Sequence, residues 1–424
     1  MSLVIALLTI FLLILSIFLF PMIKIKNLKV NSYWIIALIG AILLIIFKQV
    51  DPSVIIDTLF SYSNVNPLKI VTLFISMSIL SIFLDEIGFF NYIANLSCKK
   101  FGDNQYKLFI SLYLLISFLT VFTSNDIIIL TFTPFICYYC KNNQINPIPY
   151  LMLEFVAANT LSMLLIIGNT TNIYIATNLG IDFFTYLQNM FFPTIIVGIT
   201  SFTTIFILFR KSLKVKMTPK ESPIIKPNKG YLIIGLIHLF TTTILLALSS
   251  YFNLEMWVIT LIAAISLLFW YFIYSIITKQ NFKIAKYTLK RCPWNLICFM
   301  ISMFIIVLAV KDSPTIINLK HFLLNNNPEL SYAISGLIAC NLMNNIPMSV
   351  LYTQLLPLDA TNAIYTTIIA SNLGAILTPL GSLAGIMWLN LLKSYDIKFS
   401  YKNFVSYGFI IVSICLFALF IFVY

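Results

Sequence analysis

The sequence of residues 158–172 is ANTLSMLLIIGNTTN, and a second stretch of the same kind, SNLGAILTPLGSLAG, occupies residues 371–385. In each stretch a polar break with asparagine and glycine interrupts an apolar run. The interval from Asn159 to Gly168 is nine residues, and so is the interval from Asn372 to Gly381. A helix broken at membrane depth is tolerated only where its freed backbone lines a cavity or is buried in protein. The paired stretches therefore predict two broken helices at a binding site.

The composition around these stretches is that of a membrane protein. Of 424 residues, 60% are hydrophobic and only 9% are charged, against roughly 25% charged in a soluble domain. A crossing helix needs about 20 apolar residues, so the chain has room for roughly ten crossings. The continuous apolar runs exclude a transmembrane barrel, and the lack of a long polar stretch excludes a large soluble catalytic domain. We therefore expect an all-α, polytopic membrane protein.

The charge distribution predicts orientation. The chain carries 26 Lys and Arg against 14 Asp and Glu, a net charge of +12. The lysines lie in loops between apolar spans, as in cytoplasmic loops under the positive-inside rule, and no nucleic-acid partner is expected. All lysine-rich loops are cytoplasmic at once if the N-terminus is outside.

The first span, residues 2–20, is expected to be retained, because it lacks the basic flank and cleavage site of a signal peptide. The expected location is a bacterial cell (cytoplasmic) membrane.

The orientation also predicts an internal repeat. The first span then runs from outside to inside, whereas residues 231–249 run from inside to outside. We predict a first inverted-topology repeat at 1–210, a basic cytoplasmic linker at 211–230 and a second repeat at 231–424, each with a helical hairpin and a broken helix. The alternative is that the repeated Asn, Ser and Thr only hold packed helices together.

Asp126 is the strongest candidate for ion binding. It lies between apolar runs, directly after Asn125, and a carboxylate near the bilayer centre costs several kcal/mol unless it is solvated, paired or protonated. The alternative is a helix N-cap, a position that Asp and Asn favour. Glu154 lies roughly 10 Å into the helix that follows Pro147, and it is either a second proton site or a carboxylate neutralised by burial. His238 is expected to be a packing residue.

Other candidates are neutral or structural. Asp85 and Glu86 follow a span, and no site is expected there. Asparagine, serine and threonine recognise hydroxyls or carboxylates and supply carbonyl ligands to sodium, but they cannot carry a proton. The candidates of this type at the breaks, with two glycines, are Asn125, Asn159, Thr160, Gly168, Asn169, Asn172, Asn344, Asn345, Asn372, Thr378, Gly381 and Ser382. One central cavity is expected to be lined by Asn125, Asp126, Asn159, Asn344 and Asn372.

Motifs for catalysis, cofactors or structural metals are not found in the sequence. Cys137 and Cys140 share one helix face but are expected to pack rather than to bind a metal. We expect no enzyme activity and no cofactor beyond a coupled Na⁺ or H⁺. Energy must come from an ion gradient or from an ATPase partner subunit.

Five motifs carry a resemblance to a known family: Leu84-Asp85-Glu86-Ile87-Gly88-Phe89-Phe90, Ser124-Asn125-Asp126 with Leu130-Thr131-Phe132-Thr133-Pro134, Pro293-Trp294-Asn295, Asn344-Asn345-Ile346-Pro347, and Leu377-Thr378-Pro379-Leu380-Gly381-Ser382-Leu383-Ala384 with Trp388. Over most of its length the chain resembles the arsenite-efflux permease family of the ion-transporter superfamily. It departs from that family at Asn159 and Asn372, where members carry acidic residues, and at Ile376, where they carry a basic one. Its segment 168–172 is similar to sodium/proton exchangers and carboxylate carriers of the superfamily.

The resemblance implies a secondary active transporter with a scaffold part and a mobile part, often a homodimer. Its substrate is a small inorganic or organic solute. Efflux of arsenite or antimonite is the first expectation, and a sodium/proton antiporter or a sodium- or proton-coupled di- or tricarboxylate permease is the alternative. A channel fits the number of spans but not the paired breaks, and a membrane-embedded enzyme would need a nucleophile or a metal cluster at depth.

The orientation can be tested by labelling. Residues 214–229 are predicted to be cytoplasmic and residues 312–329 external. A cysteine introduced at Ser222 should therefore stay unmodified when intact cells are treated with a membrane-impermeant thiol reagent. Labelling of that position from outside would overturn the topology.

Overall fold

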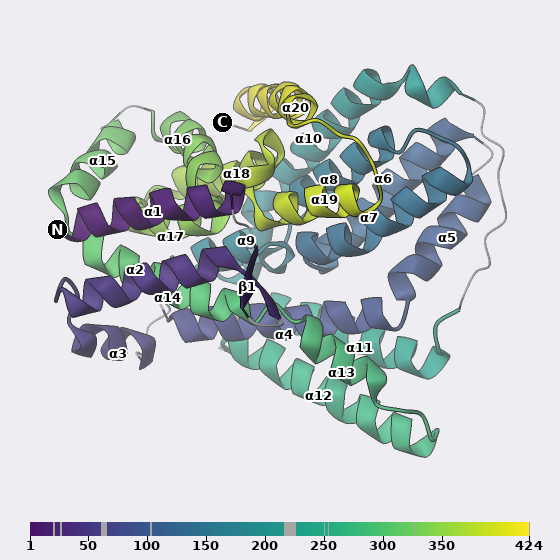
Figure 1. Cartoon of the computed structure of the whole chain (residues 1–424), viewed down its shortest axis with the longest axis horizontal. Coiled ribbons are helices and arrows are strands. Elements are labelled where there is room, and N and C mark those ends of the chain that lie inside the picture. The colour runs from purple at the N-terminus through teal and green to yellow at the C-terminus, as the bar shows by residue number, and fades with distance from the viewer. Residues whose placement is uncertain are drawn as a thin grey trace.

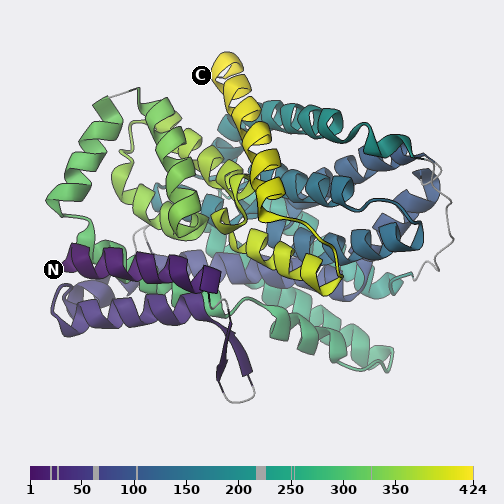
Figure 2. The ribbon, with the colours of Figure 1, turned by 45° about the horizontal axis from the view of Figure 1, so that its top comes forward.

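The computed structural model describes residues 1–424 apart from 20–21, 26–27, 61–65, 102–103, 216–225, 250, 253, 326 and 424. Three lysines used for orientation and the labelling position, Lys26, Lys216, Lys220 and Ser222, lie outside the described residues, and so does the middle of the linker 211–230. The described chain is helical except for one antiparallel hairpin of β1 (Met22–Ile25) and β2 (Leu28–Asn31). Figure 2 shows this hairpin projecting from the helices. The fold class is otherwise the expected all-α one, and the isoleucine and valine residues of the hairpin favour strands.

One set of helices, here called the peripheral group, packs around α4 (Pro67–Glu86). Within it α14 lies against α1 and α2, while α12 lies against α4 and α11 (Figure 1). Its other members are α1 (Ser2–Leu19), α2 (Ser32–Ile46), α11 (Lys229–Ala247), α12 (Met256–Ile277), α13 (Lys283–Arg291) and α14 (Asn295–Val310). The Lys69 ammonium lies 2.6 Å from a Glu255 carboxylate oxygen and so joins α4 to the start of α12. This contact with Lys69 lowers the pKa of Glu255.

The second set, here called the central group, contains two helical hairpins and two broken helices. The first hairpin is α6 (Gln105–Phe122) with α7 (Asn125–Asn142), and the second is α16 (Pro328–Met343) with α17 (Asn345–Leu355). The first broken helix is α8 (Ile148–Leu161), η1 (Ile166–Gly168) and α9 (Thr170–Asn178). The second is α18 (Thr361–Leu377), η3 (Pro379–Gly381) and α19 (Leu383–Ser394). The group is completed by α10 (Phe183–Phe209) and α20 (Tyr401–Phe422).

The broken helices bring the central group together. The first packs against the first hairpin through α6 and α7, and the second packs against the second hairpin through α16 and α17. The broken helices also contact each other, through α8 and α18 and through α9 and α18. The two broken helices therefore lie where the sequence predicted them, and each packs against a hairpin, although the division into two repeats stays a prediction. Short elements connect the rest: α3 (Pro52–Phe60), α5 (Phe89–Phe101), η2 (Ser212–Lys214) and α15 (Pro314–Asn325).

The helix lengths agree with a multi-pass membrane protein. Within the described residues, seven helices are long and apolar enough to cross a membrane, and three shorter apolar helices accompany them. Together these match the expected number of roughly ten. In α4, 83% of the most apolar window is buried inside the protein, against 28% in α11 and in α12. Because α4 also contacts α7 and α9, it is the helix on which the two groups meet.

One close approach between helices depends on a glycine. A Cβ atom added at Gly408 of α20 would lie 2.2 Å from the carbonyl oxygen of Ile376, near the end of α18. Gly198 of α10 is less crowded, because the nearest atom to an added Cβ is a methyl carbon of Leu161 at 3.3 Å. A side-chain methyl can shift, whereas a helix carbonyl is held by the backbone. Gly408 therefore sets the distance between α20 and α18.

We predict that Gly408→Ala lowers the melting temperature of the purified protein by several degrees, because overpacking of this kind costs about 1–3 kcal/mol. Gly198→Ala is the matched control. It should leave the melting temperature unchanged or raise it, since alanine favours a helix over glycine by roughly 1 kcal/mol. Equal melting temperatures for the two variants in detergent would contradict this account of the helix contact.

Candidate functional site

Asn372 of α18 joins the two breaks by hydrogen bonds. Its Oδ1 accepts from Nδ2 of Asn169 at 2.9 Å and from Oγ of Ser162 at 3.3 Å. Its Nδ2 donates to Oδ1 of Asn172 at 2.8 Å. All of these residues are buried. Side chains some 200 positions apart in the sequence therefore satisfy one another at the point where both helices are interrupted.

The same cluster reaches the tip of the first hairpin. Asn125 donates from Nδ2 to Oδ1 of Asn159 at 3.1 Å, and Ser162 donates from Oγ to the carbonyl of Asn159 at 3.2 Å. On the other side, the hydroxyls of Thr171 and Ser371 lie 3.0 Å apart. We call this set the amide cluster: Asn125, Asn159, Ser162, Asn169, Thr171, Asn172, Ser371 and Asn372.

The amide cluster is electrically neutral. Among the described residues, none of its hydrogen bonds involves a side chain of Lys, Arg, Asp or Glu. Amides and hydroxyls both donate and accept hydrogen bonds, so the cluster can exchange its internal bonds for bonds to a neutral polyol or hydroxide. It can also offer carbonyl oxygens to a hard cation such as sodium.

The two glycines of the breaks allow the chain to fold back on itself. A Cβ at Gly168 would lie 2.1 Å from the carbonyl oxygen of Ser162, and a Cβ at Gly381 would lie 2.2 Å from that of Gly374. Each break thus packs tightly against the end of the preceding helix. Asn169 then caps α9 by accepting from the Thr171 amide, and Ser382 caps α19 by accepting from Gly385. Both helices therefore begin at the breaks, where their N-termini favour negative charge.

Asp126 lies in the first turn of α7, beside the cluster. The helix begins at Asn125, and the N-cap is Ser124, whose Oγ accepts from the Asp126 amide at 3.2 Å. The alternative that Asp126 itself caps the helix is therefore wrong. Within the part of the chain that the structure describes, its carboxylate has no hydrogen-bond or ion-pair partner, although the residue is half-buried. Its neighbour Asn125 belongs to the amide cluster, so a free carboxylate adjoins the neutral site.

The tip of the second hairpin is bound to the second break. Asn344 donates from Nδ2 to the carbonyl of Leu380 at 3.0 Å, and Thr378 donates to Oδ1 of Asn341 at 2.7 Å. Asn345 is buried, and its side chain has no hydrogen-bond partner among the described residues. No hydrogen bond in the described chain links these residues to the amide cluster. The expectation that Asn344 shares one cavity with the first hairpin stays a prediction.

Two other candidates have structural partners. Thr160 is buried and donates to the carbonyl of Val156 in its own helix. Glu154 is fully buried, and its two oxygens accept from Oγ1 of Thr133 at 2.8 Å and from Nε1 of Trp388 at 3.2 Å. Glu154 thereby ties α8 to α7 and α19.

Some polar residues of the site were missed by the sequence reasoning. Ser162, Thr171 and Ser371 lie inside the two diagnostic stretches, so their polarity within an apolar run was the available signal. Asn341 comes one helical turn before Asn344-Asn345, and its Nδ2 also donates to the carbonyl of Gly374 at 3.1 Å.

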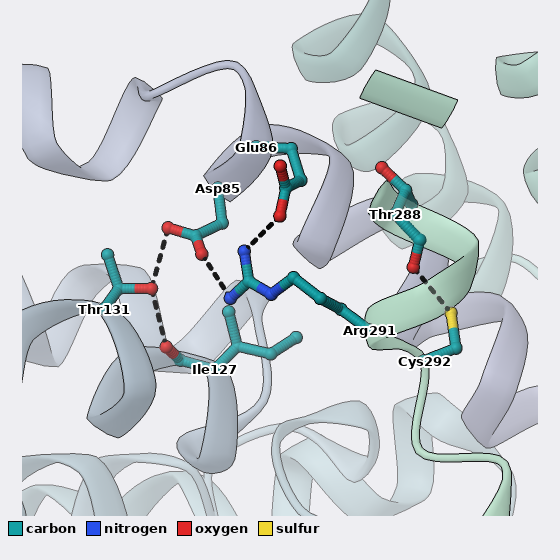
Figure 3. A network of polar contacts seen from close by, with 7 residues as sticks. All are labelled: Asp85, Glu86, Ile127, Thr131, Thr288, Arg291 and Cys292. Atoms are coloured by element: carbon teal, nitrogen blue, oxygen red, sulfur yellow. Dashed lines mark hydrogen bonds and ion pairs between the residues drawn. The ribbon is translucent and has the colours of Figure 1, made fainter. Parts of the chain in front are cut away.

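Asp85 and Glu86, where no site was expected, form an ion pair with a distant arginine. Arg291 donates from Nη2 to Oδ2 of Asp85 at 2.7 Å and from Nη1 to Oε1 of Glu86 at 2.6 Å (Figure 3). Sequence reasoning missed this ion pair, because the partners of Arg291 lie more than 200 positions away in the sequence.

His238, Cys137 and Cys140 were expected to be packing residues. His238 contacts the carbonyl of Ile234 at 2.8 Å and Oγ of Ser266 at 3.0 Å, as expected of a packing residue. Cys137 and Cys140 are buried free thiols. In the described residues no group of three or more His, Cys, Asp or Glu side chains could hold a metal ion.

We predict that Asn372→Leu destabilises the protein and abolishes transport. The change leaves the Asn169 amide without its acceptor and the Asn172 side-chain oxygen without its donor, at about 1–3 kcal/mol for each unsatisfied group. Asn178→Leu is the matched control, because Asn178 donates to the carbonyl of Tyr174 in its own helix. Thermal unfolding and vesicle transport would measure both effects. A normal Asn372→Leu protein would show that the cluster bonds are dispensable.

Comparisons with known proteins agree with this architecture. The model of a family described as citrate transporter (CitMHS) matches residues 2–363. The arsenical pump membrane protein of Escherichia coli K12 is 25% identical over 366 residues, which cover 80% of this chain and 81% of that protein. A Bacillus subtilis strain 168 protein, provisionally named as an arsenical pump membrane protein, is 25% identical over 376 residues, covering 81% and 84% of the two chains.

A solved structure shares the fold. The YdaH transporter of Alcanivorax borkumensis superimposes with a TM-score of 0.56 over 99% of this chain and 97% of that chain, at 13% sequence identity. The relatives confirm the resemblance to arsenical pumps, and with the apolar helices they indicate a multi-pass transporter of a bacterial cell membrane. The extent of the family match places the chain in the citrate transporter (CitMHS) family.

Proposed function

We propose that this transporter exports arsenite or antimonite across the cell membrane as a secondary active transporter driven by an ion gradient. The observation that carries the proposal is a buried, neutral amide cluster next to a carboxylate, Asp126, that has no partner among the described residues. Arsenite is the neutral hydroxide As(OH)₃ at pH 7, and amides and hydroxyls bind such a solute by hydrogen bonds without any counter-charge. The two relatives with arsenical pump names support the same substrate class.

The second candidate is a di- or tricarboxylate such as citrate, which the family description favours. A carboxylate substrate would need positive charge in the site. Among the described residues, no Lys or Arg side chain hydrogen-bonds to the amide cluster. The N-termini of α9 and α19, which begin beside Asn169 and Ser382, could supply part of that charge. Because helix N-termini supply only part of the positive charge that a carboxylate substrate needs, we rank citrate behind arsenite.

Exchange of sodium for protons at Asp126 would be the remaining possibility for this site.

Asp126 is the proposed coupling site. A carboxylate without a protein partner is free to take up a proton or, with amide carbonyls, to bind sodium. Glu154 is a second candidate for a proton, but the hydroxyl of Thr133 and the indole of Trp388 already occupy its two oxygens. We therefore assign coupling to Asp126 first.

The proposed transport cycle uses both halves of the chain. Two inverted repeats, 1–210 and 231–424, would place one hairpin and one broken helix on each side of the substrate. Alternating access would then move the central group against the peripheral group. A homodimer and an ATPase partner subunit are compatible with this scheme.

The substrate can be tested in a bacterial strain that lacks its own arsenite pump. Expression should confer growth on arsenite, and Asp126→Ala should abolish that growth. Asp182→Asn is the matched control, since Asp182 caps α10 and Asn caps a helix equally well. Verified membrane insertion without arsenite resistance, together with citrate uptake or sodium tolerance, would favour the alternatives.

The coupling site has its own test. Asp126→Asn should remove or alter ion coupling, because an amide cannot take up a proton at neutral pH. Transport into vesicles with an imposed gradient, measured from pH 6 to pH 8, would report the change. Wild-type transport by Asp126→Asn across that range would make Asp126 structural.

A further inference from the structure

The helix that begins beside Asp126 is held by carboxylates on two sides. On α7, Thr131 donates to Oδ1 of Asp85 at 2.8 Å, and Thr133 donates to Oε1 of Glu154 at 2.8 Å. Residues two apart on a helix point to different sides. Thr133 therefore attaches α7 to α8 of the central group, whereas Thr131 attaches it to α4 of the peripheral group.

The hydrogen bond between Thr133 and Glu154, within the central group, is expected to persist during transport. Glu154 is fully buried and bridges Thr133 to Trp388 of α19. Separation of these helices would leave a buried carboxylate without its donors, which is costly in a low-dielectric interior. We therefore expect α7, α8 and α19 to move as one body.

The contact with the peripheral group has a different construction. The guanidinium of Arg291, at the end of α13, binds Asp85 through Nη2 and Glu86 through Nη1 (Figure 3). The exposed fractions of the side chains are 36% for Arg291, 9% for Asp85 and 18% for Glu86. One oxygen of Asp85 is thus held by Arg291, and the other is presented to Thr131. We call these four residues the Arg291 network.

Thr131 can leave this network without losing its hydrogen bond. Its hydroxyl lies 2.8 Å from Asp85 Oδ1 and 2.9 Å from the carbonyl of Ile127, one turn earlier in α7. A hydroxyl has one proton, so it can bond only one of these acceptors at a time. If α7 moves away, the proton turns to Ile127, while Asp85 keeps its charged partner Arg291. The contact can therefore open without leaving an unpaired donor or an unpaired charge.

We propose that Asp85, oriented by Arg291, is a positioning residue that holds α7, and with it Asp126, against α4 through Thr131, and that this contact opens during each transport cycle. Thr131 lies five residues beyond Asp126, roughly 7.5 Å along the helix. The proposal rests on the proposed role of Asp126 in coupling, but not on the identity of the substrate.

Thr131→Val tests the positioning role with little change in shape. The maximal velocity should change about fivefold, which at 1.36 kcal/mol per factor of ten corresponds to ~1 kcal/mol, while KM stays within about twofold. The split is expected because, in the described chain, the hydrogen bonds of Thr131 go to Asp85 and Ile127 and not to the amide cluster. Thr194→Val is the matched control, since the one hydrogen bond that the buried Thr194 hydroxyl donates in the described chain goes to Met190 in its own helix. Equal velocities for the two variants would overturn the role of Thr131.

A cysteine pair tests whether the contact opens. Asp85→Cys with Thr131→Cys would be made in a Cys298→Ser background, because Cys298 is exposed and the other native cysteines are buried. Oxidation to the cross-linked form should stop transport, and dithiothreitol should restore it. Each single variant should be insensitive to the oxidant. A cross-linked protein that transports at the rate of its reduced form would show that the contact need not open.

A third measurement needs no substrate and so separates this proposal from the proposed function. Amide hydrogen exchange in residues 125–131 of the purified protein should be several-fold faster in Thr131→Val than in Thr194→Val. If arsenite is not the substrate, this difference should persist. Identical exchange in the two variants would contradict the Arg291 network as the element that holds α7.

Discussion

Every break in a membrane helix frees backbone groups that water cannot reach, and the structure depends on how those groups are satisfied. At the first break, Asn172 donates from Nδ2 to the carbonyl of Ser162 at 3.0 Å. At the second, Asn344 donates to the carbonyl of Leu380 at 3.0 Å, and the thiol of Cys340 donates to that of Gly381 at 3.1 Å. The asparagines that mark the breaks therefore stabilise the backbone and also form the candidate site.

The same constraint gives three carboxylates three different roles. Glu154 is buried between two neutral donors, and Asp85 is shared between Arg291 and Thr131. Asp126 has no partner within the described residues, although it lies beside a cluster whose amides are otherwise satisfied. A carboxylate left unpaired at such a place is expensive unless an ion or a proton compensates it. The two acids with protein partners thus differ from Asp126, which we propose as the coupling site.

The two helix groups meet at α4 with unequal attachments. Within the central group the contacts are buried and mutually dependent, because Asn372 alone bonds to four other side chains of the amide cluster. Between α7 and α4, the Thr131–Asp85 hydrogen bond has a ready replacement in the carbonyl of Ile127. A transporter needs both kinds of contact, since the site must keep its geometry while the body that carries it moves.

The sequence alone determined the membrane class, the helical hairpins, the two broken helices and most residues around them. These features are local in the sequence. The length of an apolar run indicates a membrane helix, and Asn and Gly inside such a run indicate where the helix is broken. Only the tertiary structure decided which polar groups pair: Asn372 with Asn172, Trp388 with Glu154, and Arg291 with Asp85. It also showed that Ser124 rather than Asp126 caps α7. Such partners lie up to 234 positions apart, and their pairing is set by the packing of distant helices, which no local pattern of residues encodes.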